Sequence, residues 1–151
     1  SIAELASNEI CCLAEPSGLG APYFRNDLGL RFSGAVEQLT PRAMAALLLE
    51  AIIFRVARIL EEFNAMSALE RIYLSGGLSE LSCLQQGIAL CAPCPVYRLQ
   101  QHDSSLLGAA MLAAGLPAAS HRQAVEIHSA IEGKLLQAKY QRWKIWLDSL
   151  Q

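Results

Sequence analysis

The sequence predicts an α/β fold in which helices cover a small sheet of mostly parallel strands. Short apolar runs alternate with helical patterns along the middle of the chain, which is typical of parallel strands joined by crossover helices. A 26-residue stretch carries apolar residues at helical spacing and is long enough to lie across such a sheet. With 151 residues, 53% of them hydrophobic, the chain has the length and composition of one domain with its own core.

The composition excludes several classes of protein. The 12 Lys and Arg residues stand against 14 Asp and Glu residues, and a net charge of −2 argues against binding to nucleic acid. The longest apolar stretch, residues 106–119, is shorter than the about 20 residues of a membrane span, and residues 1–5 do not begin a signal peptide. Five cysteines do not indicate a disulfide scaffold. We therefore expect a cytoplasmic protein with reduced thiols and no membrane partner.

The charge distribution divides the chain and indicates a missing neighbour. Charged residues make up 17% of the sequence, whereas soluble domains carry about 25%, so part of the surface is expected to be covered by another domain or subunit. Residues 1–119 have a net charge of −4 and residues 120–151 have +2. The second segment contains Trp143 and Trp146, and we expect it to form a terminal helix that packs on the main domain.

The first half of the chain is expected to contain two short strands and a long helix. Residues 9–14 form an apolar run typical of a buried strand, residues 18–27 are rich in Gly, Pro, Asn and Asp and read as a loop, and residues 30–36 suggest a shorter strand. A helix is predicted over Pro41–Met66, with Thr40 as its N-terminal cap. Its predicted apolar stripe is Met44, Leu47, Leu48, Ala51, Ile52, Val56, Ile59, Leu60 and Phe63.

That stripe predicts which side chains of the long helix matter for stability. Ile52 lies at its centre, so its truncation to Ala is expected to be costly. Glu50 and Arg58 fall off the stripe, and Arg58→Ala is expected to be almost neutral.

The second half repeats a strand–helix alternation. The expected elements are a strand at 71–74, a helix at about 80–91, a strand at 96–100 and a helix at 104–115.

Two strand-to-helix junctions are candidate ligand sites. Gly76 and Gly77 follow the first strand, where backbone can approach a ligand without side chains in the way. A tight turn that needs glycine only for its own backbone explains this dipeptide better when it is taken alone. Asp103 precedes the last helix, where capping is the simpler explanation. Together, however, the two junctions lie at the carboxyl ends of successive parallel strands, where open α/β sheets bind ligands.

Other reactive residues form no convincing site. Cys91 and Cys94 have Cys-x-x-Cys spacing, but they lie at a helix end rather than a helix start, and no second pair completes a zinc site. We interpret them as structural cysteines. His102, His121 and His128 are scattered, and no pair of acidic residues is placed together by spacing.

Five segments occur in an order and spacing that resemble the C-terminal domain of the FGGY carbohydrate kinases, the family of glycerol kinase, xylulokinase and gluconokinase. The resemblance extends from about residue 9 to residue 115, and residues 139–143 resemble the closing helix of the family. The segments are G-L-G-A-P-Y-F at 18–24, L-T at 39–40, L-E-A-I-I-F at 49–54, S-G-G-L-S at 75–79 and D-S-S-L-L-G-A-A at 103–110.

The resemblance implies an actin-like, ribonuclease H-like fold and the nucleotide-binding part of an ATP-dependent kinase. Residues 1–119 would be part of the nucleotide-side domain and residues 120–151 a helical extension packed on it. In the family the Gly-Gly turn packs against adenosine, which implies a nucleotide-binding role for Gly76, Gly77 and Leu78. Leu81 stands where glycerol kinase-like members have Asn, so it offers only apolar contact.

The resemblance also implies which parts of the enzyme lie elsewhere. The Glu-x-Thr-x-Leu-Gly of the family appears as Asp103 and Ser105 followed by Leu-Gly, and these two residues would border the cleft. The catalytic Asp, the carboxylates for Mg²⁺ and the sugar-binding residues belong to an upstream N-terminal kinase domain. This chain would therefore contain no catalytic residue and would be inactive alone.

Two functions remain open at this stage. The chain is either the nucleotide-binding portion of a kinase that phosphorylates a sugar or polyol with ATP and Mg²⁺, or a non-catalytic kinase-derived module that binds a partner. Leu81 and the truncated start favour the second slightly. A homodimer is left open, and the sequence does not name the sugar.

Overall fold

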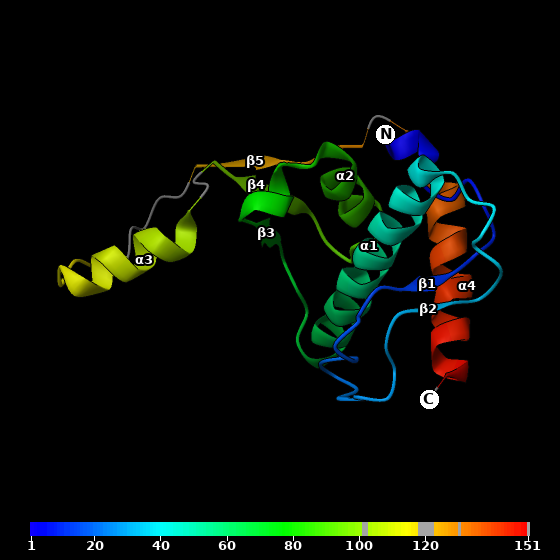
Figure 1. Ribbon diagram of the computed structural model, residues 1–151. Coiled ribbons are helices and arrows are strands. Elements are labelled where there is room, and N and C mark those ends of the chain that lie inside the picture. The colour runs from blue at the N-terminus through cyan, green and yellow to red at the C-terminus, as the bar shows by residue number, and fades with distance from the viewer. Residues whose placement is uncertain (101–102, 118–122, 130, 151) are drawn as a thin grey trace.

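The computed structural model of the chain describes residues 1–151 except 101–102, 118–122, 130 and 151. Three helices, α1 (Pro41–Met66), α2 (Ser82–Cys91) and α4 (Lys134–Ser149), form the body of the molecule, and α3 (Ser104–Ala113) extends away from it (Figure 1). None of the helices in these described ranges is long and apolar enough to cross a membrane.

The strands form two small sheets. β3 (Ile72–Leu74) and β4 (Val96–Leu99) pair in parallel, and β5 (Ala124–Glu126) pairs antiparallel with the other edge of β4. β1 (Cys12–Leu13) and β2 (Arg31–Phe32) form a separate antiparallel pair. The predicted parallel arrangement in the second half of the chain is confirmed, as is the α/β class.

The long helix has the predicted bounds and the predicted cap. The Thr40 side chain accepts a hydrogen bond from the backbone N–H of Ala43 at 3.2 Å, and Pro41 occupies the first helical position. The expectation that this helix lies across the parallel sheet is met only in part. Side chains of α1 share one core with Val96 of β4, but the main neighbours of α1 are α2, β1 and α4. The sheet is too short to cover a helix of 26 residues.

The buried face of α1 is rotated from the predicted stripe. Ile53, not Ile52, is completely buried, and Phe63 is exposed. Glu50, expected on the polar side, is buried, and Arg58 is half-buried with its Nε donating to the Tyr23 hydroxyl at 2.9 Å. Leu47 and Ala51 are buried as predicted, so the stripe was misplaced only in part. The rest differs because α1 packs on several sides at once, and a buried carboxylate with a distant partner leaves no mark on local periodicity.

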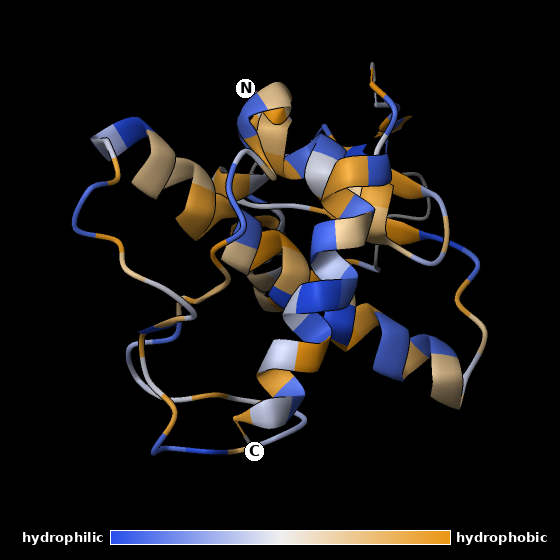
Figure 2. Ribbon diagram, turned by 90° about the vertical axis from the view of Figure 1, so that its right-hand side faces the viewer, coloured by the Kyte–Doolittle hydropathy of each residue, from blue (hydrophilic) through white to orange (hydrophobic). Residues whose placement is uncertain are grey.

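The C-terminal helix packs on the body, as expected. α4 is amphipathic, and its hydrophilic and hydrophobic residues alternate along the helix that leads to the C mark in Figure 2. Trp143 is completely buried, and its Nε1 donates to the backbone oxygen of Cys12 at 2.7 Å. The ring centroids of Tyr140 and Trp143 lie 5.4 and 5.8 Å from that of Phe54 in α1. α4 is thereby joined to both α1 and β1.

The segment before α4 was not predicted correctly. Besides α4, residues 120–151 contribute β5, which completes the three-stranded sheet. A strand of three residues at a sheet edge is too short to show a periodic pattern, so β5 could not be recognised from periodicity.

A buried ion pair connects α1, α4 and the N-terminal segment. Lys139 donates from Nζ to Oε2 of Glu50, and both side chains are almost completely removed from solvent. The backbone N–H of Ala6 donates to the other Glu50 oxygen at 2.6 Å, and Lys139 also donates to Oδ1 of Asn8 at 3.3 Å. Burial raises the pKa of Glu50, and the Lys139 ammonium opposes that rise.

The burial pattern of α1 predicts a difference between neighbouring isoleucines. Ile53→Ala should lower the free energy of unfolding by about 2–5 kcal/mol, as truncation of a fully buried isoleucine does, whereas Ile52→Ala should cost less because Ile52 is only partly buried. Urea denaturation followed by circular dichroism measures both. An equal or larger loss for Ile52→Ala would show that the buried face is centred on Ile52.

The ion pair predicts a pH-dependent loss of stability. Lys139→Met should cost about 3–5 kcal/mol near neutral pH, because it leaves the Glu50 carboxylate buried without a cation. The pKa of Glu50 is raised in the folded state, so the protonated form of this carboxyl group stabilises the fold. This contribution is fully present below the unfolded pKa of about 4.3 and is lost as the pH rises through the folded pKa. The loss should therefore be smaller at pH 4.5 than at pH 8.

A double variant provides the control for this prediction. In Glu50→Gln with Lys139→Met, neither buried charge is present, so the pH dependence added by the single substitution should disappear. Denaturant titrations at the two pH values measure the difference. A loss for Lys139→Met that is equal at both would contradict the assignment to Glu50.

Candidate functional site

The Gly-Gly turn lies between β3 and α2, and a buried serine forms a hydrogen bond to its backbone. Gly76 has a φ of +96°, a conformation that favours glycine, and the short 3-10 helix η2 (Gly77–Glu80) begins directly after it. The Ser79 hydroxyl is buried and donates to the Gly76 carbonyl at 2.6 Å. The first N–H groups of a helical turn have no partner within it, so η2 presents donors at this end.

The outer side of the turn is open. Among the residues that the structure describes, no atom lies within 4 Å of a Cβ added at Gly76 or at Gly77, so these residues leave the backbone open at both positions. The side chains of Leu78 and Leu81 are exposed beside it. Of the two glycines in the turn, only Gly76 has a positive φ. The structure therefore places the four residues singled out from the sequence on one exposed turn.

The second junction meets the first. The Ser75 hydroxyl, directly after β3, donates to the Ser104 hydroxyl at 2.8 Å, which joins the turn to the start of α3. Asp103 occupies the N-cap position of α3, but its side chain makes no capping hydrogen bond, so the capping expected from the sequence is not observed. Asp103 and Ser105 are both exposed at this junction. The carboxyl ends of the two parallel strands thus lie together, as the sequence suggested.

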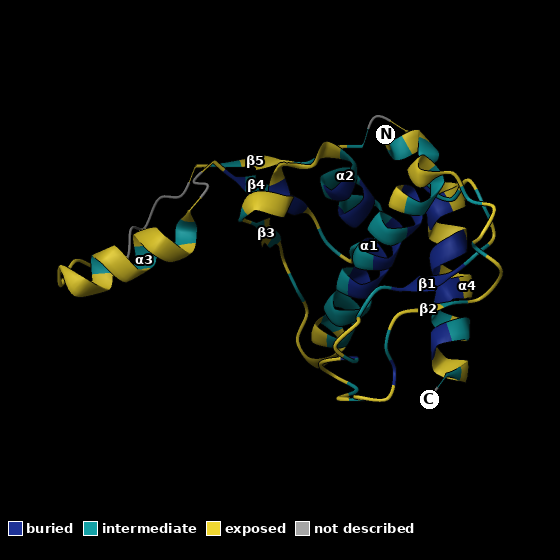
Figure 3. Ribbon diagram, in the orientation of Figure 1, coloured by how far each residue is buried: buried dark blue, intermediate teal, exposed yellow. Residues whose placement is uncertain are grey.

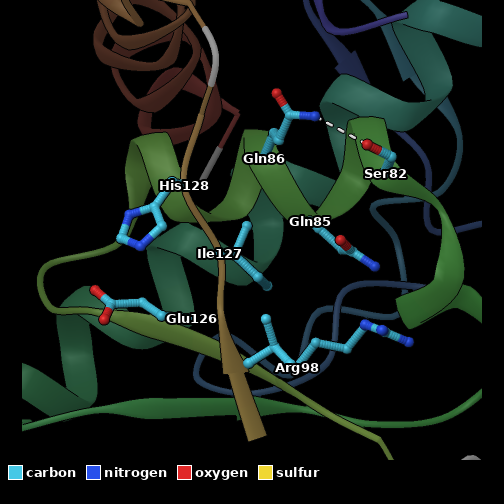
Figure 4. A pocket seen from close by; sticks show the side chains of 8 residues that line it. Ser82, Gln85, Gln86, Arg98, Glu126, Ile127 and His128 are labelled. Atoms are coloured by element: carbon cyan, nitrogen blue, oxygen red, sulfur yellow. Dashed lines mark hydrogen bonds between the residues drawn. The ribbon is translucent and has the colours of Figure 1, made fainter.

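A groove of about 250 Å³ lies next to the turn, between α2 and the strands β4 and β5 (Figure 4). It was not predicted, because β5 was not recognised in the sequence. Its lining residues are Ser82, Gln85, Gln86, Arg98, Val125, Glu126, Ile127 and His128.

The polar groups of this groove are largely engaged with the protein itself. Arg98 donates from Nη1 to both carboxylate oxygens of Glu80 at 3.1 and 3.0 Å. Gln85 donates to the Ser79 carbonyl at 2.5 Å, and Gln86 donates to the Ser82 hydroxyl at 2.8 Å (Figure 4). These contacts brace the beginning of α2 and the turn that precedes it.

The cysteines and histidines do not form a reactive centre in the part of the chain that the structure describes. Burial raises the pKa of the Cys91 thiol to about 12 and also raises that of Cys94, so neither is an activated thiolate. Within the described residues no group of His, Cys, Asp and Glu is placed to hold a metal ion. His128 borders the groove, whereas His102 and His121 lie outside the described residues.

The fold and the paired junctions define an α/β class of protein, and comparison with known proteins identifies the family. Residues 3–115 match the FGGY family of carbohydrate kinases, C-terminal domain, and the chain belongs to this family. A glycerol kinase from Trichormus variabilis is 35% identical over 102 residues, which cover 66% of this chain and 20% of that protein. Glycerol kinase 2 from Streptomyces coelicolor is 28% identical over 139 residues, covering 84% of this chain and 27% of that protein.

Solved kinase structures have the same fold. The glycerol kinase of Plasmodium falciparum with ADP superimposes with a TM-score of 0.72 at 18% identity, over 97% of this chain and 31% of that chain. A xyloylose kinase from Brucella ovis gives a TM-score of 0.71 at 19% identity, over 96% of this chain and 32% of that chain. The chain thus spans about a third or less of the length of these relatives.

Proposed function

We propose that this chain is the nucleotide-side portion of a cytoplasmic kinase that transfers the γ-phosphate of ATP to a hydroxyl of a sugar or polyol. The observation that carries the proposal is the open Gly76–Gly77 turn at the carboxyl ends of two parallel strands. Such ends are where open α/β sheets bind ligands. Family membership and the ADP complex of the Plasmodium relative support a nucleotide as that ligand.

The glycine at position 77 supports the same proposal. Gly77 has no positive φ, and a Cβ added there would meet no atom of the described residues within 4 Å. Folding alone therefore gives no reason for glycine here, in contrast to Gly76. A ligand that approaches the backbone would supply that reason.

The residues around the turn fit the apolar part of a nucleoside. Leu78 and Leu81 are exposed and can pack against a base or ribose, whereas neither can hydrogen-bond it. Recognition of the base would therefore fall to backbone groups. Asp103 and Ser105, at the facing junction, would border the cleft on its α3 side.

The described residues do not fit a magnesium site, because no cluster of acidic side chains is placed to ligate a cation. The proposal assigns the metal, the general base and the sugar-binding groups to the remaining part of a longer kinase, so the 151-residue chain alone would be inactive. We also propose that residues 1–119 form the nucleotide-side unit, with residues 120–151 as its extension.

A non-catalytic interaction module is the second candidate. The observation that favours it is Leu81, an exposed apolar side chain without a hydrogen-bonding group beside the turn. The two candidates differ in whether the turn binds a nucleotide, which the following experiments measure.

Substitution of Gly77 tests the nucleotide site in the full-length kinase. Gly77→Val should raise the KM for ATP at least tenfold. The valine side chain would project into the open space through which the nucleotide approaches the backbone of Gly77 in the proposed site. Sugar binding without nucleotide should change little. Steady-state kinetics with ATP as the varied substrate measure the effect.

Gly20→Val is the matched control for this substitution. A Cβ at Gly20 also meets no atom within 4 Å and Gly20 has no positive φ, but it lies in the loop before β2. Its KM for ATP should stay within about twofold of the parent. If Gly77→Val kept its KM for ATP and lost only sugar binding, the nucleoside assignment of the turn would be wrong.

The isolated chain should bind nucleotide only weakly. Its described residues provide a surface for the nucleoside but no cation site for the phosphates. Calorimetric titration of the 151-residue chain with ATP should therefore give a Kd well above micromolar. A micromolar Kd, about −8 kcal/mol of binding free energy, would show that the chain holds the phosphates by itself.

A further inference from the structure

Two exposed leucines lie beside the open backbone of the Gly-Gly turn. Leu78 is 61% exposed and Leu81 is 42% exposed, and neither is part of the core that the described residues form. The segment between β3 and α2 is mostly exposed, whereas α2 itself contributes buried residues (Figure 3). We call the side chains of Leu78 and Leu81 the leucine face. It can pack against a flat ring, but it has no group that hydrogen-bonds the edge of that ring.

The polar side chains that follow the turn are engaged with the protein. The Ser79 hydroxyl is buried and donates to the backbone of the turn at 2.6 Å. Both carboxylate oxygens of Glu80 accept a hydrogen bond from Arg98. The Ser82 hydroxyl accepts one from the Gln86 amide at 2.8 Å. These hydrogen-bonding groups are therefore directed to partners within the chain rather than to a ligand on the turn.

Three backbone carbonyls of the turn also have donors already. The Gly76 carbonyl accepts from both the N–H and the hydroxyl of Ser79, at 3.0 and 2.6 Å. The Leu78 carbonyl accepts from the N–H of Leu81 at 3.1 Å, and the Ser79 carbonyl accepts from the Gln85 amide at 2.5 Å. An acceptor would be needed to recognise the amino group of adenine, since guanine carries a carbonyl oxygen at the same position. None of these three carbonyls is left without a donor to make that distinction.

We propose that the leucine face makes the kinase tolerant of the purine base, so that it binds ATP and GTP with similar affinity. This inference rests on the proposed function, because it concerns the same turn. Apolar side chains pack equally well on either purine ring, and an apolar site does not strongly reject a ligand that differs only in its polar groups. The ring nitrogen N7 is an acceptor in both bases, so a backbone N–H that binds it does not distinguish them either.

Equilibrium binding tests the proposal without a sugar substrate. Calorimetric titration of the full-length kinase with ADP and with GDP should give Kd values within about tenfold of each other, because the leucine face packs against either base. These two nucleotides are suitable probes because neither is consumed during the titration. A larger preference for either of them would overturn the proposal.

A matched pair of variants tests whether the leucine face contacts the base. Leu81→Asn replaces an apolar side chain by an amide of similar shape, which can hydrogen-bond the amino group and N7 of adenine. The ratio of the Kd for GDP to the Kd for ADP should therefore rise at least about fivefold. Leu135→Asn makes the same change at a leucine of α4 that is 76% exposed, and it should leave both Kd values unchanged. An unchanged ratio in Leu81→Asn, or the same rise in both variants, would contradict the proposal.

The Gly77→Val variant separates a failure of this inference from a failure of the proposed function. If the turn binds the nucleotide, this substitution should weaken the binding of ADP and of GDP by the same factor. Weaker binding of both nucleotides to Gly77→Val, together with a strong preference of the parent kinase for ADP, would retain the nucleotide site and refute the tolerance of the base. Unchanged Kd values for both nucleotides in Gly77→Val would refute the nucleotide site itself, and the inference with it.

Discussion

The buried contact between Glu50 and Lys139 is the constraint on which the arrangement of the chain depends. The two residues are 89 positions apart, and removing each charge from water costs several kcal/mol unless its partner is in place. α4 can therefore dock on α1 in one register only. The same carboxylate binds the backbone of Ala6, so the N-terminal segment is fixed by the same interaction. The ion pair defines the orientation of α4 on α1, and the buried rings of Trp143 and Phe54 stabilise that orientation by apolar contact.

This rigid body determines how the candidate site is held. Packing of α2 against α1 and α4 fixes the helix that follows the Gly-Gly turn, and Ser79 and Gln85 transmit that position to η2 through their hydrogen bonds. The backbone of Gly77 is exposed, but the helix α2 that follows it is packed against the body of the molecule. A binding site on a rigid element loses little conformational entropy when a ligand binds.

The features that could be predicted from the sequence are the local ones. The cap at Thr40, the bounds of α1 and the parallel pairing of β3 with β4 follow from capping chemistry and from alternation, and the structure confirms them. Glu50 in the core and β5 in the sheet were missed, because their partners are distant in the sequence. Placement of the turn at a strand end was predictable, whereas the bond between Ser75 and Ser104 that joins the two junctions was not.

That serine pair gives the turn a second support. Ser75 follows β3 and precedes the glycines, and Ser104 begins α3, so one hydrogen bond joins the turn to the start of α3. On the other side, Ser79 and Gln85 join the turn to α2. A displacement of either helix would therefore move the backbone at Gly76 and Gly77, so the geometry of the proposed nucleotide site depends on both helices.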